Sequence, residues 1–396
     1  MKWTWTESRE SKLAGQELFV ANAAGFRLNP HMKLPGCTVV LVAFVSMAFA
    51  EDKSSPAVNQ ADASWQWVTF PDSRLEVRGL PLFATNSPQL WRLPKTAKEE
   101  VPKAVWNRAV APDGGRIRLR SDTSRLAVRV QATQRPGKPC HFDAYADVEF
   151  AGTAIVRGTQ VVDLVLFEKK DRVPRDIAIY LPNNQEVRVL AIGLDAGAPL
   201  KPPRAFALPA PIVCYGSSVL QGTGSAHPGS TYPAALARQL NLDFVNLGFG
   251  GAGKAEPRVV RFVASLEACC FLFDLGKSYG NQTIEPFAQM LEAVRAAHPN
   301  APIFCVTPIY STKEASEPDY RDRSEKLRAL MRQAATDRQK AGDKNIFVAE
   351  GLELFGKADE DAFNDPLHPN DAGNARIANR LAPRVKNVLF EKPTAP

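Results

Sequence analysis

Three side chains that lie far apart in the chain have the types that nucleophilic catalysis requires. Asp365 and His368 belong to the segment Asp-Pro-Leu-His-Pro near the C-terminus, and Ser218 follows an apolar run much earlier in the chain. A serine hydroxyl becomes a nucleophile when an imidazole accepts its proton, and a carboxylate must orient that imidazole. The three residues therefore predict a serine hydrolase with Ser218 as nucleophile, His368 as base and Asp365 as orienting acid.

The elements that must position these residues alternate between apolar strands and helices. The expected segments are 212–215, 232–240, 244–247, 256–266, 269–273, 284–297, 303–307, 319–340, 346–349 and 372–388. Five such βα units predict a five-stranded parallel, doubly wound (flavodoxin-like) sheet with helices on both faces. Ligands bind such sheets beyond the carboxyl ends of the strands. Ser218, Gly251, Ser278 and His368 each follow a strand directly, so we expect them to meet at that edge.

The preceding region, residues 64–200, has a different pattern. Short runs such as 116–120, 126–130 and 176–181 alternate apolar and polar residues, with turn-forming residues between them. This pattern predicts an antiparallel β-sandwich. The Pro-rich stretch 197–204 is expected to be a semi-rigid linker. We therefore expect a β-sandwich domain over 64–200 and a hydrolase domain over 208–390.

The first fifty residues have the pattern of an export signal. Lys33 precedes an apolar run at 39–45, which is followed by Ala48-Phe49-Ala50. This is the layout of a secretory signal peptide with a small-residue cleavage site, and the run is too short to span a bilayer. Residues 1–50 are therefore expected to be an N-terminal extension plus a signal peptide, with the translation start at Met32 and cleavage near Ala50. The expected product is exported, periplasmic or extracellular, and has no stable membrane anchor.

Composition and charge argue against other classes of protein. The chain is 45% hydrophobic and 23% charged, as expected for a globular protein, and its net charge of +7 is scattered rather than gathered in a stripe. A nucleic-acid partner is therefore not expected. The odd number of cysteines after residue 50 gives no disulfide framework. No two histidines there have the i, i+4 spacing of a helical metal site, so neither a metal nor an organic cofactor is expected.

The C-terminal half resembles the SGNH (GDSL-type) hydrolases. Its first block is Tyr-Gly-Ser-Ser-Val-Leu-Gln-Gly at 215–222, with Ser218 at the nucleophile position. The second block is Asn-Leu-Gly-Phe-Gly-Gly at 246–251, and the last is the D-x-x-H-P run at 365–369. The resemblance implies a Ser218–His368–Asp365 triad. It also implies an oxyanion hole that uses the backbone N–H groups of Ser218 and Gly251.

The third block departs from the family pattern. The family has an oxyanion asparagine in a G-x-N arrangement, whereas this chain has Gly276-Lys277-Ser278. Ser278 or Asn281 is expected to take that place, or Lys277 to supply a positive charge instead. Loss of one oxyanion donor lowers the rate by about 10²–10³. The departure therefore predicts a slow enzyme or a changed substrate class. It does not predict a full loss of activity, since the triad and two backbone N–H donors remain.

The N-terminal region is similar to the β-sandwich that precedes the hydrolase in one SGNH subgroup. An F-D-x-Y motif of that subgroup is present as Phe142-Asp143-Ala144-Tyr145. The resemblance implies an exported esterase that hydrolyses ester bonds, O-acetyl groups on carbohydrate above all. Its partner is then an acylated carbohydrate or another small ester.

Two other functions are compatible with parts of the sequence. Residues 248–253 fit the G-x-G-x-x-G pattern of dinucleotide-binding proteins, but they follow the second strand of their domain rather than the first. The departure at Ser278 fits a catalytically weak or inactive protein of the same fold that binds glycans. Retention of Ser218, His368 and Asp365 favours the esterase over both.

Overall fold

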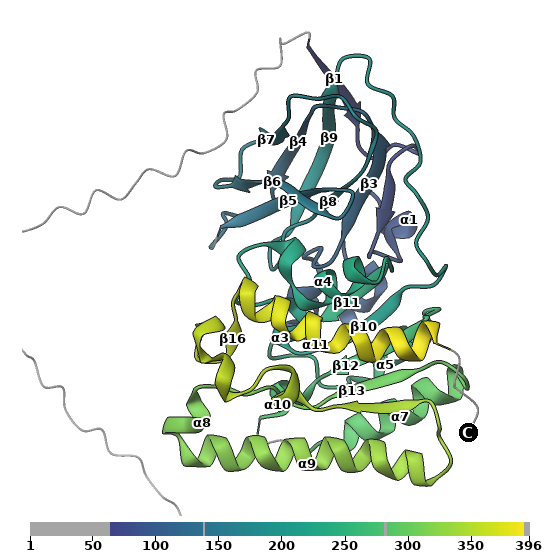
Figure 1. Cartoon of the computed structure of the whole chain (residues 1–396), viewed down its shortest axis with the longest axis vertical. Coiled ribbons are helices and arrows are strands. Elements are labelled where there is room, and N and C mark those ends of the chain that lie inside the picture. The colour runs from purple at the N-terminus through teal and green to yellow at the C-terminus, as the bar shows by residue number, and fades with distance from the viewer. Residues whose placement is uncertain (1–63, 138, 281–282, 392–396) are drawn as a thin grey trace, which may run out of the picture. The chain divides into compact units, whose positions relative to one another are not determined.

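The computed structural model describes residues 64–137, 139–280 and 283–391. The expected signal peptide and Asn281 lie outside these ranges. The described part of the chain consists of a β-sandwich followed by an α/β region, as Figure 1 shows. This arrangement confirms the predicted fold class.

Two antiparallel sheets form the sandwich. The first sheet has the order β1-β9-β4-β7, with bounds Trp65–Thr69, Val187–Asp195, Arg125–Ala132 and Val162–Glu168. The second has the order β2-β3-β8-β5-β6, with bounds Glu76–Arg78, Arg116–Ser121, Arg175–Tyr180, Cys140–Ala146 and Glu149–Val156. Along β4, Val128 and Val130 are buried, whereas Arg129 and Gln131 remain partly exposed. This two-residue period places apolar side chains of both sheets in one shared core.

A segment before the third strand packs outside the sandwich. It contains α1 (Phe83–Asn86), the 3-10 helix η1 (Lys95–Glu99) and α2 (Lys103–Ala109), none of which the sequence pattern had predicted. Leu93, Val105 and Trp106 from this segment are buried in the core beneath the C-terminal parallel sheet. The segment therefore ties the N-terminal region to the α/β region through apolar contacts.

The second half of the chain is built on a parallel sheet of five strands. Its order is β11-β10-β12-β13-β14, with bounds Phe244–Gly248, Ile212–Gly216, Cys270–Asp274, Ile303–Val306 and Ile346–Ala349. All neighbouring pairs are parallel. The order 2-1-3-4-5 is that of flavodoxin-like sheets. The three central strands, β10, β12 and β13, are buried throughout because helices cover both faces.

Long helices cover the two faces of this sheet, as Figure 1 shows. On one face lie α5 (Pro257–Ala264), α7 (Glu285–Ala297) and α9 (Pro318–Lys340); on the other lie α4 (Tyr232–Gln239) and α11 (Asp371–Phe390). Val213 and Tyr215 of β10 point to the first face, and Ile212 and Cys214 point to the second. Short elements complete this region: α3 (Ser218–Gln221), η2 (Pro228–Ser230), α6 (Gly276–Tyr279), α8 (Lys313–Ser316), α10 (Gly351–Leu354), η3 (Lys357–Ala362), β15 (Phe363–Asp365) and β16 (His368–Pro369).

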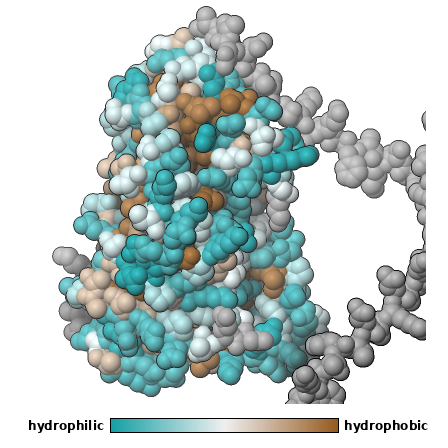
Figure 2. Space-filling model, turned by 180° about the vertical axis from the view of Figure 1, so that it is seen from behind, coloured by the Kyte–Doolittle hydropathy of each residue, from teal (hydrophilic) through white to brown (hydrophobic). Residues whose placement is uncertain are grey.

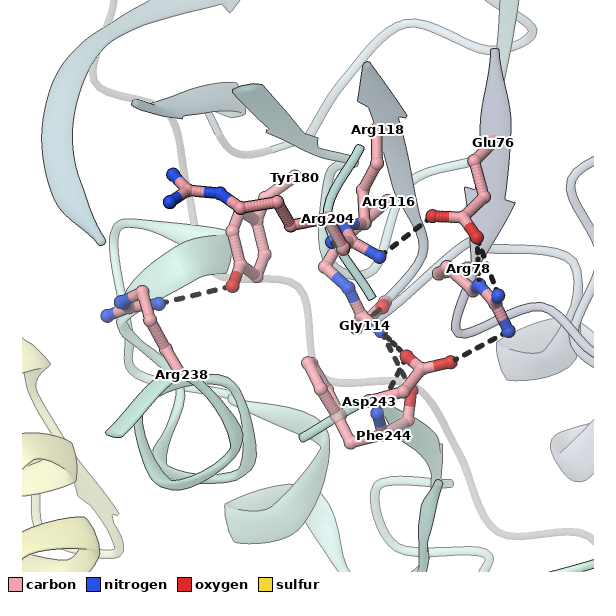
Figure 3. A network of polar contacts seen from close by, with 10 residues as sticks. All are labelled: Glu76, Arg78, Gly114, Arg116, Arg118, Tyr180, Arg204, Arg238, Asp243 and Phe244. Carbon is pink, nitrogen blue, oxygen red and sulfur yellow. Dashed lines mark hydrogen bonds and ion pairs between the residues drawn. The ribbon is translucent and has the colours of Figure 1, made fainter. Parts of the chain in front are cut away.

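A polar network joins the sandwich to the α/β region (Figure 3). The buried guanidinium of Arg116 on β3 pairs with Asp243, which precedes β11, and lies 4.0 Å from the centre of the Phe244 ring. Arg238 of α4 donates to the hydroxyl of Tyr180 on β8 at 3.2 Å. Removing one partner of a buried ion pair is strongly destabilising, so this network fixes the sandwich on the α/β region.

Figure 2 shows one face of the molecule, on which hydrophilic residues predominate and a hydrophobic patch lies over the sandwich. Among the described residues, none of the helices is both long enough and apolar enough to cross a bilayer.

Candidate active site

Ser218 lies where strand β10 turns sharply into helix α3. Gly216 ends the strand, and a Cβ at this position would lie 2.2 Å from the carbonyl oxygen of Asp274, so only glycine fits. Ser217 caps the helix, because its hydroxyl accepts a hydrogen bond from the Val219 N–H at 3.2 Å. The following residue, Ser218, is therefore the first helical residue, and it is partly exposed.

The three residues predicted to form a triad lie in one hydrogen-bonded chain. Ser218 Oγ is 2.9 Å from His368 Nε2. On the other side of the ring, His368 Nδ1 is 2.9 Å from both carboxylate oxygens of Asp365. With the ring proton on Nδ1 and donated to Asp365, Nε2 presents a lone pair to the Ser218 hydroxyl. In this tautomer the imidazole is able to accept the serine proton.

Backbone groups of its own loop hold the Asp365 carboxylate in place. Asp365 Oδ1 accepts hydrogen bonds from the N–H groups of Leu367 at 2.9 Å and His368 at 3.0 Å. Partial burial opposes ionisation, but the bonds from His368 and Leu367 outweigh it and lower the pKa of Asp365. The side chain is therefore an anion at neutral pH, as the orienting role requires.

The turn after β11 lies against Ser218. A Cβ built on Gly250 would be 3.1 Å from the Ser218 Cβ, and the Gly250 N–H donates to Gln221 Oε1 at 2.7 Å. Gly251 follows with a positive φ of 70°, a conformation that favours glycine. Within the described ranges, the N–H groups of Ser218 and Gly251 have no hydrogen-bond acceptor. Both are thus available to a substrate oxygen.

Gln221 is a positioning residue that the sequence analysis did not identify. Its side chain is fully buried, accepts the Gly250 N–H and donates to Asp113 at 3.1 Å. It thereby fixes the turn that presents Gly251. Gln221 belongs to the first sequence block, at 215–222. Its role depends on contacts with Gly250 and Asp113, which are distant in the sequence, so no local sequence pattern indicates it.

The two candidates for the third oxyanion donor have different positions. Ser278 lies in α6, directly after β12, with 8% of its surface exposed. Its hydroxyl is buried and has no hydrogen-bond partner among the described residues. An unpaired buried hydroxyl is uncommon, so its proton is available for a partner that the free protein does not supply. Asn281 is not among the described residues.

Two buried ionisable groups lie beneath this edge of the sheet. Burial raises the pKa of Asp274 to about 7, although Tyr232 donates to its carboxylate at 3.2 Å. Burial lowers the pKa of Lys277 to about 8, and its ammonium donates to the carbonyls of Tyr310 at 3.1 Å and Leu367 at 3.3 Å. Because Leu367 directly precedes His368, Lys277 supports the loop that carries His368.

The glycines of the G-x-G-x-x-G run are required by close packing within this site. A Cβ on Gly248 would lie 2.4 Å from the Gln221 nitrogen, and one on Gly253 would lie 2.3 Å from the Gly216 oxygen. Their small size therefore lets the turn approach β10 and α3. This packing accounts for the pattern without a nucleotide.

Two family models match the chain. The model described as the GDSL-like Lipase/Acylhydrolase family matches residues 209–386. The model described as the N-terminus of Esterase_SGNH_hydro-type matches residues 65–200. No curated protein matches the sequence.

Solved structures share the fold of both regions. A GDSL-like protein from Bacteroides ovatus has a TM-score of 0.72 and 23% identity, over 84% of this chain and 100% of its own. The salicylyl-acyltransferase SsfX3 of a tetracycline biosynthetic pathway has a TM-score of 0.67 and 24% identity, over 84% and 99%. A family two carbohydrate esterase from Clostridium thermocellum, in complex with cellohexaose, has a TM-score of 0.55 and 17% identity, over 71% and 96%. These likenesses extend across the sandwich and the α/β region.

Proposed function

Because this chain belongs to the GDSL-like lipase/acylhydrolase family and is therefore a serine ester hydrolase, we propose that Ser218, His368 and Asp365 are its catalytic triad. The observation that carries the proposal is the pair of contacts on either side of the imidazole, 2.9 Å to Ser218 and 2.9 Å to Asp365. We also propose that the sandwich over 64–200 and the hydrolase region over 208–390 are its two domains.

The reaction begins with attack by Ser218 on an ester carbonyl. His368 Nε2 accepts the hydroxyl proton as Ser218 Oγ bonds to the carbonyl carbon, and Asp365 stabilises the imidazolium. The tetrahedral intermediate breaks its bond to the alcohol, which leaves with the proton from His368. Water then attacks the acyl-enzyme in the same way. His368 accepts a proton from the water and returns it to Ser218 Oγ as the acid leaves.

The negative oxygen of each tetrahedral intermediate binds to backbone donors. The N–H groups of Ser218 and Gly251 take this role, and the Ser278 hydroxyl is the third donor. The unpaired state of all three groups in the described part of the chain supports the assignment. Such donors act on charge that develops in the transition state, where each contributes about 10²–10³ in rate.

Two similarities to known proteins support a proposal for the substrate class. A carbohydrate esterase bound to cellohexaose is among the similar folds, and the chain carries the N-terminal region typical of SGNH-type esterases. We therefore assign this enzyme O-acylated carbohydrate, with O-acetyl groups as the ester that is cleaved. The protein is exported by way of residues 1–50, and N-terminal sequencing of protein from the culture medium or periplasm tests cleavage after Ala50.

The experiment that tests this function compares three substrates in the presence of wild type and of Ser218→Ala. Acetate release is measured from acetylated xylan, and chromophore release from p-nitrophenyl acetate and p-nitrophenyl butyrate. We expect acetate release by the wild type, a preference for acetyl over butyryl esters and no turnover by the variant. Glycan binding without acetate release would instead support the non-catalytic alternative.

A further inference from the structure

A second group of reactive side chains lies outside the proposed triad. His141 and Asp143 are on β5 of the sandwich, and His227 immediately precedes η2 in the α/β region. One potential ligand atom from each residue lies within 4.8 Å of those of the other two. The closest pair is His227 Nδ1 and Asp143 Oδ1, at 2.9 Å. Two imidazoles and a carboxylate thus converge from two parts of the fold.

The carboxylate of Asp143 is unusual because it is completely buried, with 0% exposed. Its other oxygen accepts the Gly229 N–H at 3.0 Å. Among the described residues, His227 is its sole ion-pair partner, and no arginine or lysine pairs with it. Buried charges in proteins are paired or coordinate a metal. His227 is charged only when it is protonated, so it is a weaker partner for a buried carboxylate than an arginine, a lysine or a metal ion.

The orientation of His141 suits a metal ligand. Its Nδ1 is 3.4 Å from the hydroxyl oxygen of Thr153, and that hydroxyl donates its own proton to the Phe142 carbonyl at 3.1 Å. The Thr153 oxygen therefore acts as an acceptor toward Nδ1–H, which leaves the lone pair of His141 on Nε2. Ligating histidines in metalloproteins have their second nitrogen held by such a partner.

We propose that His141, Asp143 and His227 form a binding site for a divalent transition-metal ion, with Zn²⁺ as the ion that fits their chemistry. Two histidine nitrogens and one carboxylate oxygen are a known zinc ligand set that leaves one position open for water. Tetrahedral ligand atoms at zinc distances lie about 3.3 Å apart. Side-chain rotation therefore has to widen the 2.9 Å separation of His227 and Asp143 slightly and shorten the widest separation, which is at most 4.8 Å. His227 is 28% exposed, which gives the ion and its water a route to solvent.

The site would fasten the sandwich to a loop that borders the proposed triad. His227 belongs to the connection between α3 and α4, and Asp371 Oδ1 accepts the backbone N–H groups of Ala226 at 3.0 Å and His227 at 3.4 Å. In the same connection, a Cβ built on Gly224 would lie 2.7 Å from the Cβ of His368. A metal at this site therefore holds the wall beside the catalytic histidine in place, and it takes no part in the ester chemistry.

No metal was predicted from the sequence because the third ligand is distant from the other two. His141 and Asp143 are separated by one residue on a strand, and His227 comes from a different region. Strand residues at i and i+2 point to the same face of a sheet, so the first two ligands have the spacing that a shared ion needs.

The test is a Zn²⁺ titration of the full chain after removal of metal with a chelator. Isothermal titration calorimetry gives the affinity and stoichiometry, and the visible spectrum of the Co²⁺-loaded protein reports the coordination geometry. The ligand variants are His141→Gln and His227→Gln. His298→Gln is the matched control for a histidine outside the cluster, and His368→Gln reports binding at the proposed triad. Circular dichroism checks that each variant is folded.

We expect one ion per chain, with affinity lowered about 100-fold or more in the two ligand variants and unchanged in the two controls. Thermal stability should rise with Zn²⁺ concentration in the wild type and stay constant in His141→Gln, because a ligand that binds only the folded state stabilises it by mass action. No binding by the wild type would overturn the proposal, as would binding that survives in both ligand variants. Binding lost in His368→Gln would assign the ion to the triad instead. If His227→Gln does not fold, His141→Gln decides the question.

Discussion

The proposed base works only if His368 carries its proton on Nδ1, and the substitution Asp365→Asn tests that requirement. The backbone N–H groups of Leu367 and His368 both donate to Asp365 Oδ1. In the variant they hold the amide oxygen at this position, so the amide NH₂ takes the place of Oδ2, 2.9 Å from His368 Nδ1. The amide oxygen at the Oδ1 position is also 2.9 Å from Nδ1, but it already accepts the two backbone N–H groups. The amide N–H at the Oδ2 position repels a proton on Nδ1, so the imidazole proton is favoured on Nε2, where it faces Ser218.

The size of the effect follows from the bonds that hold the amide in that orientation. Turning the amide to restore the correct tautomer would leave two N–H donors without an acceptor, at about 1–3 kcal/mol each. The total of about 2–6 kcal/mol corresponds to a rate loss between about 30-fold and about 10⁴-fold. The upper end matches the loss of about 10⁴ that the same substitution causes in a serine protease.

The assay is steady-state hydrolysis of p-nitrophenyl acetate at neutral pH, with kcat and KM determined separately. The loss should appear in kcat, because the substitution affects proton transfer rather than substrate binding. Asp361→Asn is the matched control, since Asp361 pairs with Arg376 on the surface and has no bond to His368. A loss of less than about 10-fold in Asp365→Asn, in a folded protein, would refute the tautomer argument.

Three further predictions concern the groups around the site. Ser278→Ala should lower kcat by about 10²–10³ without changing the melting temperature, because the hydroxyl has no partner in the described part of the free enzyme; a loss found only in Asn281→Ala would assign the third donor to Asn281. The pKa of Asp274 rises from 3.8 to about 7 on folding, so its contribution to stability is present below 3.8 and is lost as the pH approaches about 7. The melting temperature of Asp274→Asn, relative to that of the wild type, should therefore increase as the pH rises from about 4 to about 7. A difference in melting temperature that stays constant over this pH range would contradict the raised pKa of Asp274. Arg92→Leu should lower the free energy of unfolding by about 3–5 kcal/mol in urea titrations, because it removes the buried charge paired with Asp113 at 3.2 Å and the bond to the Gly248 carbonyl at 2.7 Å; a change below about 1 kcal/mol would show that the pair is dispensable.

The features that the sequence predicted well are those that depend on local patterns. Apolar strands followed by amphipathic helices predicted the parallel sheet, because parallel strands buried on both faces read as continuous apolar runs. The same reasoning placed Ser218 after the first strand and His368 near the last helix. Both lie at carboxyl ends of strands or in the loops beyond them, which is why their proximity was predictable.

The features that the sequence did not predict depend on contacts between distant segments. Helix α2 is too short to show a helical period, and its side chains are buried against a sheet that comes more than a hundred residues later. Gln221 is a positioning residue only because the Gly250 N–H, from the turn after β11, donates a hydrogen bond to its side chain. Lys277 lies in the block that departs from the family pattern at Ser278, but its burial and its bond to Leu367 are consequences of tertiary packing.

The most direct test of the central proposal is covalent labelling of the wild type with a fluorophosphonate probe, followed by mass-spectrometric mapping of the labelled peptide. A single modified serine at Ser218, with no labelling of Ser218→Ala or His368→Gln, is the result that the proposed triad predicts. Labelling at another serine, or a folded wild type that is not labelled, would contradict it.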